Sequence, residues 1–143
     1  MHRLLYVSES TAEPSKKDLM IEQLVAQAQV KNAQINVTGA LIFTGSHFAQ
    51  VLEGPSETLH ILMASINNDR RHTNVVLVDK FPVPSRLFPS WDMAYQGPNQ
   101  FVSRHVTKLL DATSKSDRRR AGEWITELAL GFSTYRASSK YLN

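Results

Sequence analysis

The stretch that most constrains the fold spans residues 37–54 and reads V-T-G-A-L-I-F-T-G-S-H-F-A-Q-V-L-E-G. Two runs rich in β-favouring apolar residues flank a short polar segment, a pattern that predicts a β-hairpin. Gln50 shares one face of the second strand with Phe48 and Leu52, because residues two apart lie on the same side of a strand. That face needs covering, and an unpaired amide on a covered face costs about 1–3 kcal/mol. Gln50 therefore either bonds to a helix end or a buried water, as most buried polar groups do, or faces a polar ligand.

A strand and an amphipathic helix are predicted ahead of the hairpin. Residues 3–8 read R-L-L-Y-V-S, a short strand with Tyr6 in its middle, on the face opposite ordinary core residues. Ser15 and Asp18 resemble a capping box, and apolar residues then recur at helical spacing. We therefore expect a helix that ends near residues 31–32.

Helix and strand patterns alternate after the hairpin as well. A second helical stripe is followed by an apolar strand at residues 75–78, a proline-rich loop, and a fifth strand with Trp91, Met93 and Tyr95 on one face. The resulting order, β-α-β-β-α-β-β, is that of a ferredoxin-like α+β fold, with two helices on one face of a mixed sheet. We assign this domain to residues 1–97.

Residues 98–143 form a separate helical extension in this interpretation. Apolar residues recur at helical spacing over 101–110 and again over 121–132, with a polar break between them. Two helices with apolar faces and no sheet of their own either cover the open face of the sheet or form a contact between subunits.

Composition restricts the class of protein without naming a partner. Of the 143 residues, 42% are hydrophobic and 20% charged, which suits a folded domain with a real core. The net charge of +3 includes a triple arginine at 118–120, but no aromatic residues interleave with it, so a solvated helix face is favoured over nucleic-acid binding. The chain has no cysteine, no leader-like start and no run approaching the length of a membrane span. We expect a soluble cytoplasmic protein that binds neither membrane nor nucleic acid.

The residues offer little support for a hydrolytic or metal enzyme. The five histidines lie at no metal-ligand spacing, and no nucleophile elbow or glycine-rich phosphate loop occurs. We therefore expect a protein that is not an enzyme and holds no metal.

Four polar side chains on otherwise apolar elements point to a ligand instead. In this topology the first and third strands are central and both helices cover one face, so Tyr6 and Gln50 are neighbours beneath the helices. Asn32 and Arg71 then lie at helix ends. An asparagine amide can pair with an N–H/C=O edge such as that of a pyrimidine. Each residue alone is explained as a satisfied structural group, but the four together predict a flat ligand between the helices.

Residues 3–95 resemble a BLUF domain, a blue-light sensor that uses a flavin. Six matching pieces occur in order over about two-thirds of the chain, and their joint occurrence is far more specific than any single motif. They are L-x-Y-x-S at 4–8, Asn32, x-T-G at 37–39, F-x-Q-x-L-E-G at 48–54, D-x-R-H at 69–72 and R-x-F-x-x-W-x-M at 86–93.

The resemblance implies a photochemical pair. Tyr6 would donate an electron and a proton to the photoexcited flavin, and Gln50 would rotate or tautomerise as they return, which gives a reversible red-shifted signalling state. Asn32 would hold the pyrimidine edge of the ring. Lys31 stands at a second ring-edge position, where relatives often carry Asn or His.

The resemblance also implies the remaining contacts. The other residues implied to contact or wall the ring are Asp69, Arg71, His72, Val37, Leu41, Phe48 and Ile66. Ser8, Trp91 and Met93 match the signal relay of the family. FAD is the default cofactor of the family, with FMN or riboflavin as alternatives.

We therefore expect a short stand-alone sensor that signals through a homo-oligomer or an unidentified protein partner. A ferredoxin-like RNA- or ligand-binding module without photochemistry is an alternative, although the hairpin lacks an RNP-type run. An acylphosphatase-like enzyme would require a phosphate-binding loop after the first strand, where acidic residues occur instead. A further alternative is a BLUF fold that binds flavin but transmits no signal.

Overall fold

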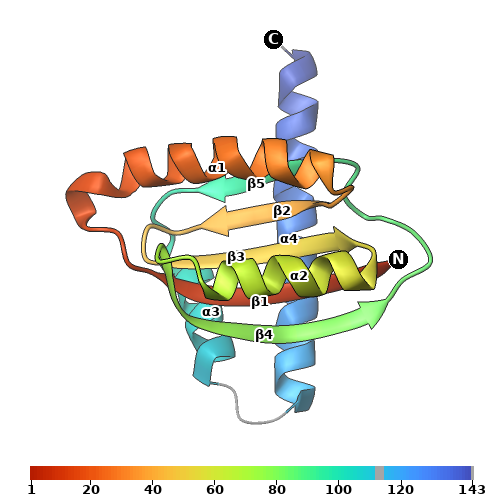
Figure 1. Cartoon of the computed structure of the whole chain (residues 1–143). Coiled ribbons are helices and arrows are strands. Elements are labelled where there is room, and N and C mark those ends of the chain that lie inside the picture. Colours follow the sequence, from red (N-terminus) through yellow and green to blue (C-terminus); the bar gives the residue numbers. More distant parts are fainter. Residues whose placement is uncertain (112–114, 143) are drawn as a thin grey trace.

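A five-stranded mixed sheet organises the chain (Figure 1). The computed structural model describes residues 1–111 and 115–142, with side chains for 1–110 and 116–134. The strand order is β4-β1-β3-β2-β5, and β5 is parallel to β2 while the other neighbouring pairs are antiparallel. The strands are β1 His2–Ser10, β2 Thr38–Phe43, β3 His47–Gly54, β4 His72–Pro82 and β5 Trp91–Gln96. The predicted ferredoxin-like α+β fold, with β1 and β3 in its interior, is confirmed.

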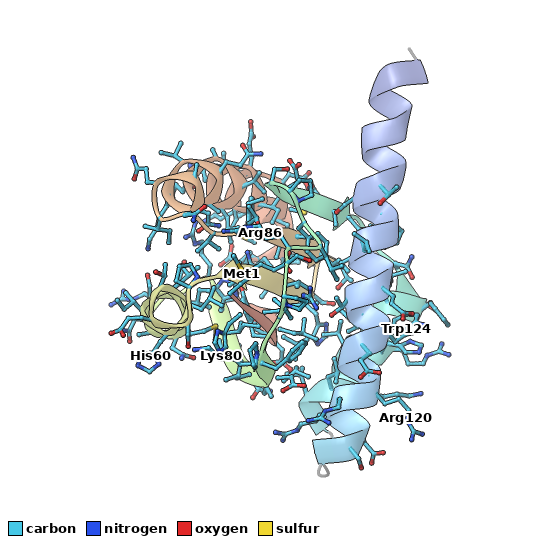
Figure 2. All side chains as sticks on the ribbon, turned by 90° about the vertical axis from the view of Figure 1, so that its right-hand side faces the viewer. Met1, His60, Lys80, Arg86, Arg120 and Trp124 are labelled. Carbon is cyan, nitrogen blue, oxygen red and sulfur yellow. The ribbon has the colours of Figure 1, made fainter. Side chains whose placement is uncertain are left out.

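Helices cover both faces of the sheet, so the molecule has three layers (Figure 2). The helices are α1 Lys17–Gln34, α2 Ser56–Asn67, α3 Gln100–Asp111 and α4 Lys115–Leu142, and a 3₁₀ turn at Pro14–Lys16 precedes α1. On one face α1 and α2 cover a core that includes Tyr6 and Phe48. On the other face Val106 of α3 and Ile125 of α4 pack on the strands. Of the two alternatives for the C-terminal helices, the structure shows the first: they cover the open sheet face.

Two glycines allow unusually close packing. A Cβ atom at Gly39, where φ is +154°, would lie 1.9 Å from the carbonyl oxygen of Val51 on β3. At Gly122 of α4 a Cβ atom would lie 3.1 Å from methyl groups of Leu5 and Val78. The first glycine sets the approach of β2 to β3, and the second sets the approach of α4 to the sheet.

The start of α1 differs from the prediction. Ser15 lies inside the 3₁₀ turn that begins at Pro14, so it cannot occupy the N-cap position of the helix. Lys16 is the N-cap residue and makes no side-chain capping bond. The predicted capping box at Ser15 and Asp18 is therefore wrong, although the helix itself is confirmed and runs on to Gln34.

The prediction that Tyr95 shares a face with Trp91 and Met93 is also wrong. Leu41 of β2 is paired with Met93, but the next residue, Ile42, is paired with Tyr95, so Ala94 is an extra residue in β5. Because of this β-bulge, Tyr95 faces the opposite side of the sheet from the one that the alternation predicts. Trp91 and Met93 pack beneath α1 and α2, whereas Tyr95 packs on the side of α4.

A buried carboxylate ties β3 to the segment that enters β5. Glu53 is fully buried, and its carboxylate accepts a hydrogen bond from Arg3 Nε at 3.0 Å. It also accepts backbone N–H bonds from Leu87 and Phe88 at 2.8–3.0 Å. Arg86 donates to the Glu53 carbonyl at 2.8 Å. The loop between β4 and β5 is thus fixed to the central strand by charge-assisted bonds.

None of the helices within residues 1–111 and 115–142 combines the length and apolar character needed to cross a lipid bilayer.

Candidate functional site

A cavity of about 170 Å³ lies between α1 and α2. Its floor includes Tyr6 of β1 and Gln50 of β3, which face each other directly in the strand register. Its rim includes the exposed residues Gln27 and Lys31 of α1 and Ser65 of α2. The lining residues are Tyr6, Leu24, Gln27, Ala28, Lys31, Asn32, Gln50, Leu62, Ser65, Ile66, Asp69, Arg71 and His72.

The floor holds one short hydrogen bond. Tyr6 Oη donates to Gln50 Oε1 at 2.5 Å, and both side chains are buried. Burial raises the pKa of the Tyr6 phenol well above its usual value; nearby Asp69 raises it further, and Arg71 opposes the shift. Tyr6 is therefore a neutral phenol at physiological pH, with its proton directed at the Gln50 carbonyl. The carbonyl oxygen of Gln50 is bonded to Tyr6, so the NH₂ group is the donor that Gln50 can present to a ligand.

His72 lies beside this pair as a neutral base. Its Nδ1 is 2.8 Å from Ser8 Oγ, and its ring is 4.4 Å from the ring of Phe48. Burial lowers the pKa of His72 to about 4; Asp69 opposes the shift and Arg71 adds to it. Near pH 7 the imidazole therefore adds a hydrogen bond but no charge to the site.

Arg71 and Asp69 form a charged pair at the cavity. The ion pair is bidentate: Arg71 Nη2 lies 2.6 Å from Asp69 Oδ2, and Arg71 Nε lies 2.9 Å from Asp69 Oδ1. The side-chain hydrogen bond from Arg71 lowers the pKa of Asp69 below its usual range, although partial burial opposes the shift. Arg71 Nη1 also donates to Gln27 Oε1 at 3.1 Å. This bond links the loop after α2 to α1 across the cavity.

A second polar bridge joins the two helices directly. Lys31 Nζ donates to Ser65 Oγ at 3.2 Å, and both residues are exposed. The next residue, Asn32, also lines the cavity but is buried, with 3% of its surface exposed. Neighbouring residues of α1 thus supply one charged group to the rim and one amide to the interior.

The structure brings eight of the predicted site residues to the cavity: Tyr6, Lys31, Asn32, Gln50, Ile66, Asp69, Arg71 and His72. Three others, Val37, Leu41 and Phe48, belong to the apolar core under the same helices but do not line the cavity. Sequence reasoning missed Gln27 as a lining residue. A signal was present, because Leu24, Gln27, Ala28 and Lys31 recur at i, i+3, i+4 and i+7 on one helix face.

The three predicted relay residues do not form one cluster. Met93 lies in a cross-sheet row with Leu41, Gln50 and Tyr6, so one strand separates it from Gln50. Trp91 lies in a different cross-sheet row, which reaches β1 at Leu4, four residues before Ser8. Ser8 is therefore distant from the row of Trp91 along β1, and it is hydrogen-bonded to His72. Trp91 Nε1 is buried and has no hydrogen-bond partner among the described residues.

A larger cavity, about 480 Å³, lies on the opposite face between α4 and strands β1 and β4. None of the predicted site residues lines it. The cavity between α1 and α2 is therefore the candidate site, because it joins the buried tyrosine–amide pair to apolar walls.

Comparison with known proteins gives a family for the chain. The family described as "BLUF: Sensors of blue-light using FAD" matches residues 1–94. The blue light- and temperature-regulated antirepressor BluF of Escherichia coli (strain K12) is 45% identical over 76 residues, which cover 53% of this chain and 18% of that protein. The photoactivated adenylate cyclase subunit beta of Euglena longa is 37% identical over 87 residues, which cover 61% of this chain and 10% of that protein. The chain thus spans about a tenth to a fifth of these relatives.

Solved structures share the fold. The dark-state structure of BlrB, a BLUF protein, is 26% identical with a TM-score of 0.62, over 88% of this chain and 95% of that one. The ground state of BlsA has a TM-score of 0.64 at 23% identity, over 76% of this chain and 72% of that one. The latter likeness concerns the fold alone.

Proposed function

The chain belongs to the BLUF family of flavin-using blue-light sensors, and we propose that Tyr6 and Gln50 carry its photochemistry. The predicted family, and a sensory rather than enzymatic domain, are confirmed by the match over residues 1–94. The observation that carries the proposal for the two residues is the 2.5 Å bond from Tyr6 Oη to Gln50 Oε1 at the floor of the cavity.

The cavity residues suit a flavin. The side chains of Leu24, Ala28, Leu62 and Ile66 supply apolar walls to a slot whose floor is polar, the combination typical of cofactor sites. Asn32 and the NH₂ group of Gln50 can pair with the N–H and C=O groups of a flavin ring. The cavity of about 170 Å³ is smaller than the roughly 300–1,000 Å³ of typical ligand sites. Flavin binding therefore requires α1 and α2 to separate at their polar bridges. Within that site FAD is the cofactor we propose, as in the family description.

Tyr6 acts as the donor in this proposal. A bound flavin supplies blue-light absorption and an excited state that accepts an electron. Tyr6 gives up one electron, and its phenolic proton leaves along the existing bond to Gln50 Oε1. The electron and the proton both return to Tyr6, so the cycle consumes nothing. Burial favours the neutral phenol, which keeps the proton in place until the electron leaves.

Gln50 converts this transfer into a lasting change. Its amide presents an acceptor to Tyr6 in the structure. Rotation or tautomerisation exchanges which of its atoms donate and which accept. With a flavin bound, the exchanged donor and acceptor atoms of Gln50 would change the hydrogen bonds to the ring and lower its excitation energy, which would be the origin of the proposed red shift.

We further propose that residues 1–97 sense light and residues 98–143 pass the signal on. Trp91 and Met93 lie on the cavity side of β5, and Tyr95, two residues later, stacks on Phe132 of α4 with ring centroids 4.8 Å apart. A shift of β5 would thus reach α4 directly. The receiver in this proposal is a second copy of the chain or an unidentified protein. Ser8 contributes through His72 rather than through Trp91.

The alternative interpretation as an RNA-binding module is disfavoured, because the sheet face that such modules use is covered. Ferredoxin-like RNA-binding domains stack bases on aromatic residues of an open sheet face. Here α3 and α4 cover that face among the described residues (Figure 2).

The test is an absorption spectrum of the flavin-loaded protein, recorded in the dark and after a blue flash. We expect a small red shift that decays in darkness. Tyr6→Phe and Gln50→Leu should bind flavin and lose the shift, whereas Gln23→Leu, an exposed glutamine of α1, should retain it. A full shift in Gln50→Leu would refute the proposed mechanism.

The output route is tested by hydrogen exchange and by the apparent mass in solution, each in darkness and in light. Exchange in α3 and α4 should change with light, and Phe132→Ala should reduce that change while leaving the spectral shift intact. If light altered neither exchange nor association of residues 98–143, the output role of this segment would be wrong.

A further inference from the structure

We propose that Lys31 binds a phosphate group on the side chain of the flavin, so that the protein selects phosphorylated flavins over riboflavin. The inference rests on the proposed function, because it assumes that the flavin ring occupies the cavity between α1 and α2. Its starting point is the position of Lys31 at the exposed rim, directly beside the buried Asn32.

The floor of the cavity sets the direction of the ligand. In a flavin, N5 and the side-chain-bearing N10 lie on opposite edges of the central ring. If the N5 edge meets Gln50 at the floor, the side chain leaves through the rim. The exposed rim residues are Gln27, Lys31 and Ser65. Any phosphate on that side chain therefore emerges among these three residues.

The charges at the cavity leave Lys31 as the cation for this role. Arg71 is the other cation lining the cavity, and its guanidinium is already held by both oxygens of Asp69. A phosphate near that pair would also meet the Asp69 carboxylate. Lys31, by contrast, donates to the neutral hydroxyl of Ser65, and no carboxylate of the described residues is paired with it. An ammonium group suits a phosphate because it provides a full charge with three donors on a flexible stem.

The bond between Lys31 and Ser65 also explains how the group becomes available. The ring needs more room than the cavity of about 170 Å³ provides, so the helices separate and the 3.2 Å bridge opens. An exposed bond between an ammonium and a hydroxyl contributes little net stability, because water replaces it readily. The phosphate then takes the position of Ser65 as the partner of Lys31.

The test compares riboflavin and FMN, which differ only in the phosphate. The full chain is freed of flavin, and each ligand is titrated by its fluorescence quenching. We expect FMN to bind about tenfold more tightly than riboflavin, as suits one charge-assisted hydrogen bond at a solvent-exposed rim. Lys31→Gln should reduce this preference to about one by weakening FMN alone, and Lys31→Arg should preserve it. Higher salt should weaken FMN and leave riboflavin unchanged, since exposed charges are screened.

Lys16→Gln is the matched control, because Lys16 is exposed and does not line the cavity. It should retain the preference of the natural chain. Equal binding of FMN and riboflavin, or an equal loss of both in Lys31→Gln, would overturn the phosphate assignment. The light-induced shift with riboflavin would then still support the proposed function. If neither flavin bound, the proposed function itself would fail.

Discussion

The titration of His72 provides a direct test of the environment beside Tyr6. Burial lowers the pKa of this imidazole from its ordinary 6.5 to about 4 in the folded chain. Between these values the unfolded chain binds a proton that the folded chain does not, so unfolding becomes easier as the pH falls. The gap is about 2.5 pH units, and each unit corresponds to about 1.4 kcal/mol. His72 should therefore lower the free energy of unfolding by about 3 kcal/mol between pH 6.5 and pH 4.

The assay is urea unfolding of the flavin-free chain at several pH values in this window. His72→Asn lowers stability at pH 7, because it removes the ring that packs on Phe48. Its stability should then fall less steeply than that of the natural chain as the pH drops to 4. Asp69 does not interfere, since its lowered pKa means that its contribution is lost only below about pH 3.8. The exposed His60 provides the control, and His60→Asn should follow the natural profile. Parallel profiles for His72→Asn and the natural chain would refute the assignment of a buried neutral imidazole.

Three further substitutions test packing away from the cavity. Glu53→Gln should lower the free energy of unfolding by about 3 kcal/mol in urea, because it leaves Arg3 without its buried partner; a change under about 0.5 kcal/mol would contradict a structural role. Gly39→Ala should lower the melting temperature sharply, since its Cβ would lie 1.9 Å from the Val51 carbonyl oxygen, and an unchanged value would show that β2 can shift. Gly131→Ala, with nothing within 4 Å of the new Cβ, should instead raise the free energy of unfolding by up to about 1 kcal/mol; a loss of stability would mean that this part of α4 is packed.

The alternation of apolar residues was enough to predict most of the sheet. The element order predicts that Tyr6 and Gln50 are neighbours, because it makes β1 and β3 adjacent. The observed register confirms this, since the two residues lie directly opposite each other. The faces of β1 follow from the period of two, which places Leu5 and Val7 on the face opposite Tyr6; the structure shows this separation, with Tyr6 in one core and Leu5 and Val7 in the other. Both features depend only on the residue pattern within a strand or on the order of the elements, so they can be predicted from one sequence.

Other features depend on contacts that leave no local signal. The bulge at Ala94 inserts one residue without disturbing the apolar pattern of β5, so the reversal of Tyr95 was not predictable. Bonds between long surface side chains, such as Lys31 to Ser65, join helices far apart in sequence, and neither residue type specifies its partner. The same holds for the packing of α3 and α4, because an amphipathic face does not identify what covers it.

The strand β5 is where the proposed sensing and output layers meet, and the bulge is what allows this. An uninterrupted strand would keep Trp91, Met93 and Tyr95 on one side of the sheet; with one extra residue, Met93 stays in the row of Gln50 while Tyr95 reaches Phe132 of α4. The opposite end of β5 is connected to the same central strand, because Glu53, three residues after Gln50, holds the amides of Leu87 and Phe88 just before β5 begins. A rearrangement of Gln50 that displaced Met93 would therefore act on a strand whose entry is fixed to β3. Its exit, which stacks on α4, is the end left to move, and this makes α4 the natural receiver of the proposed signal.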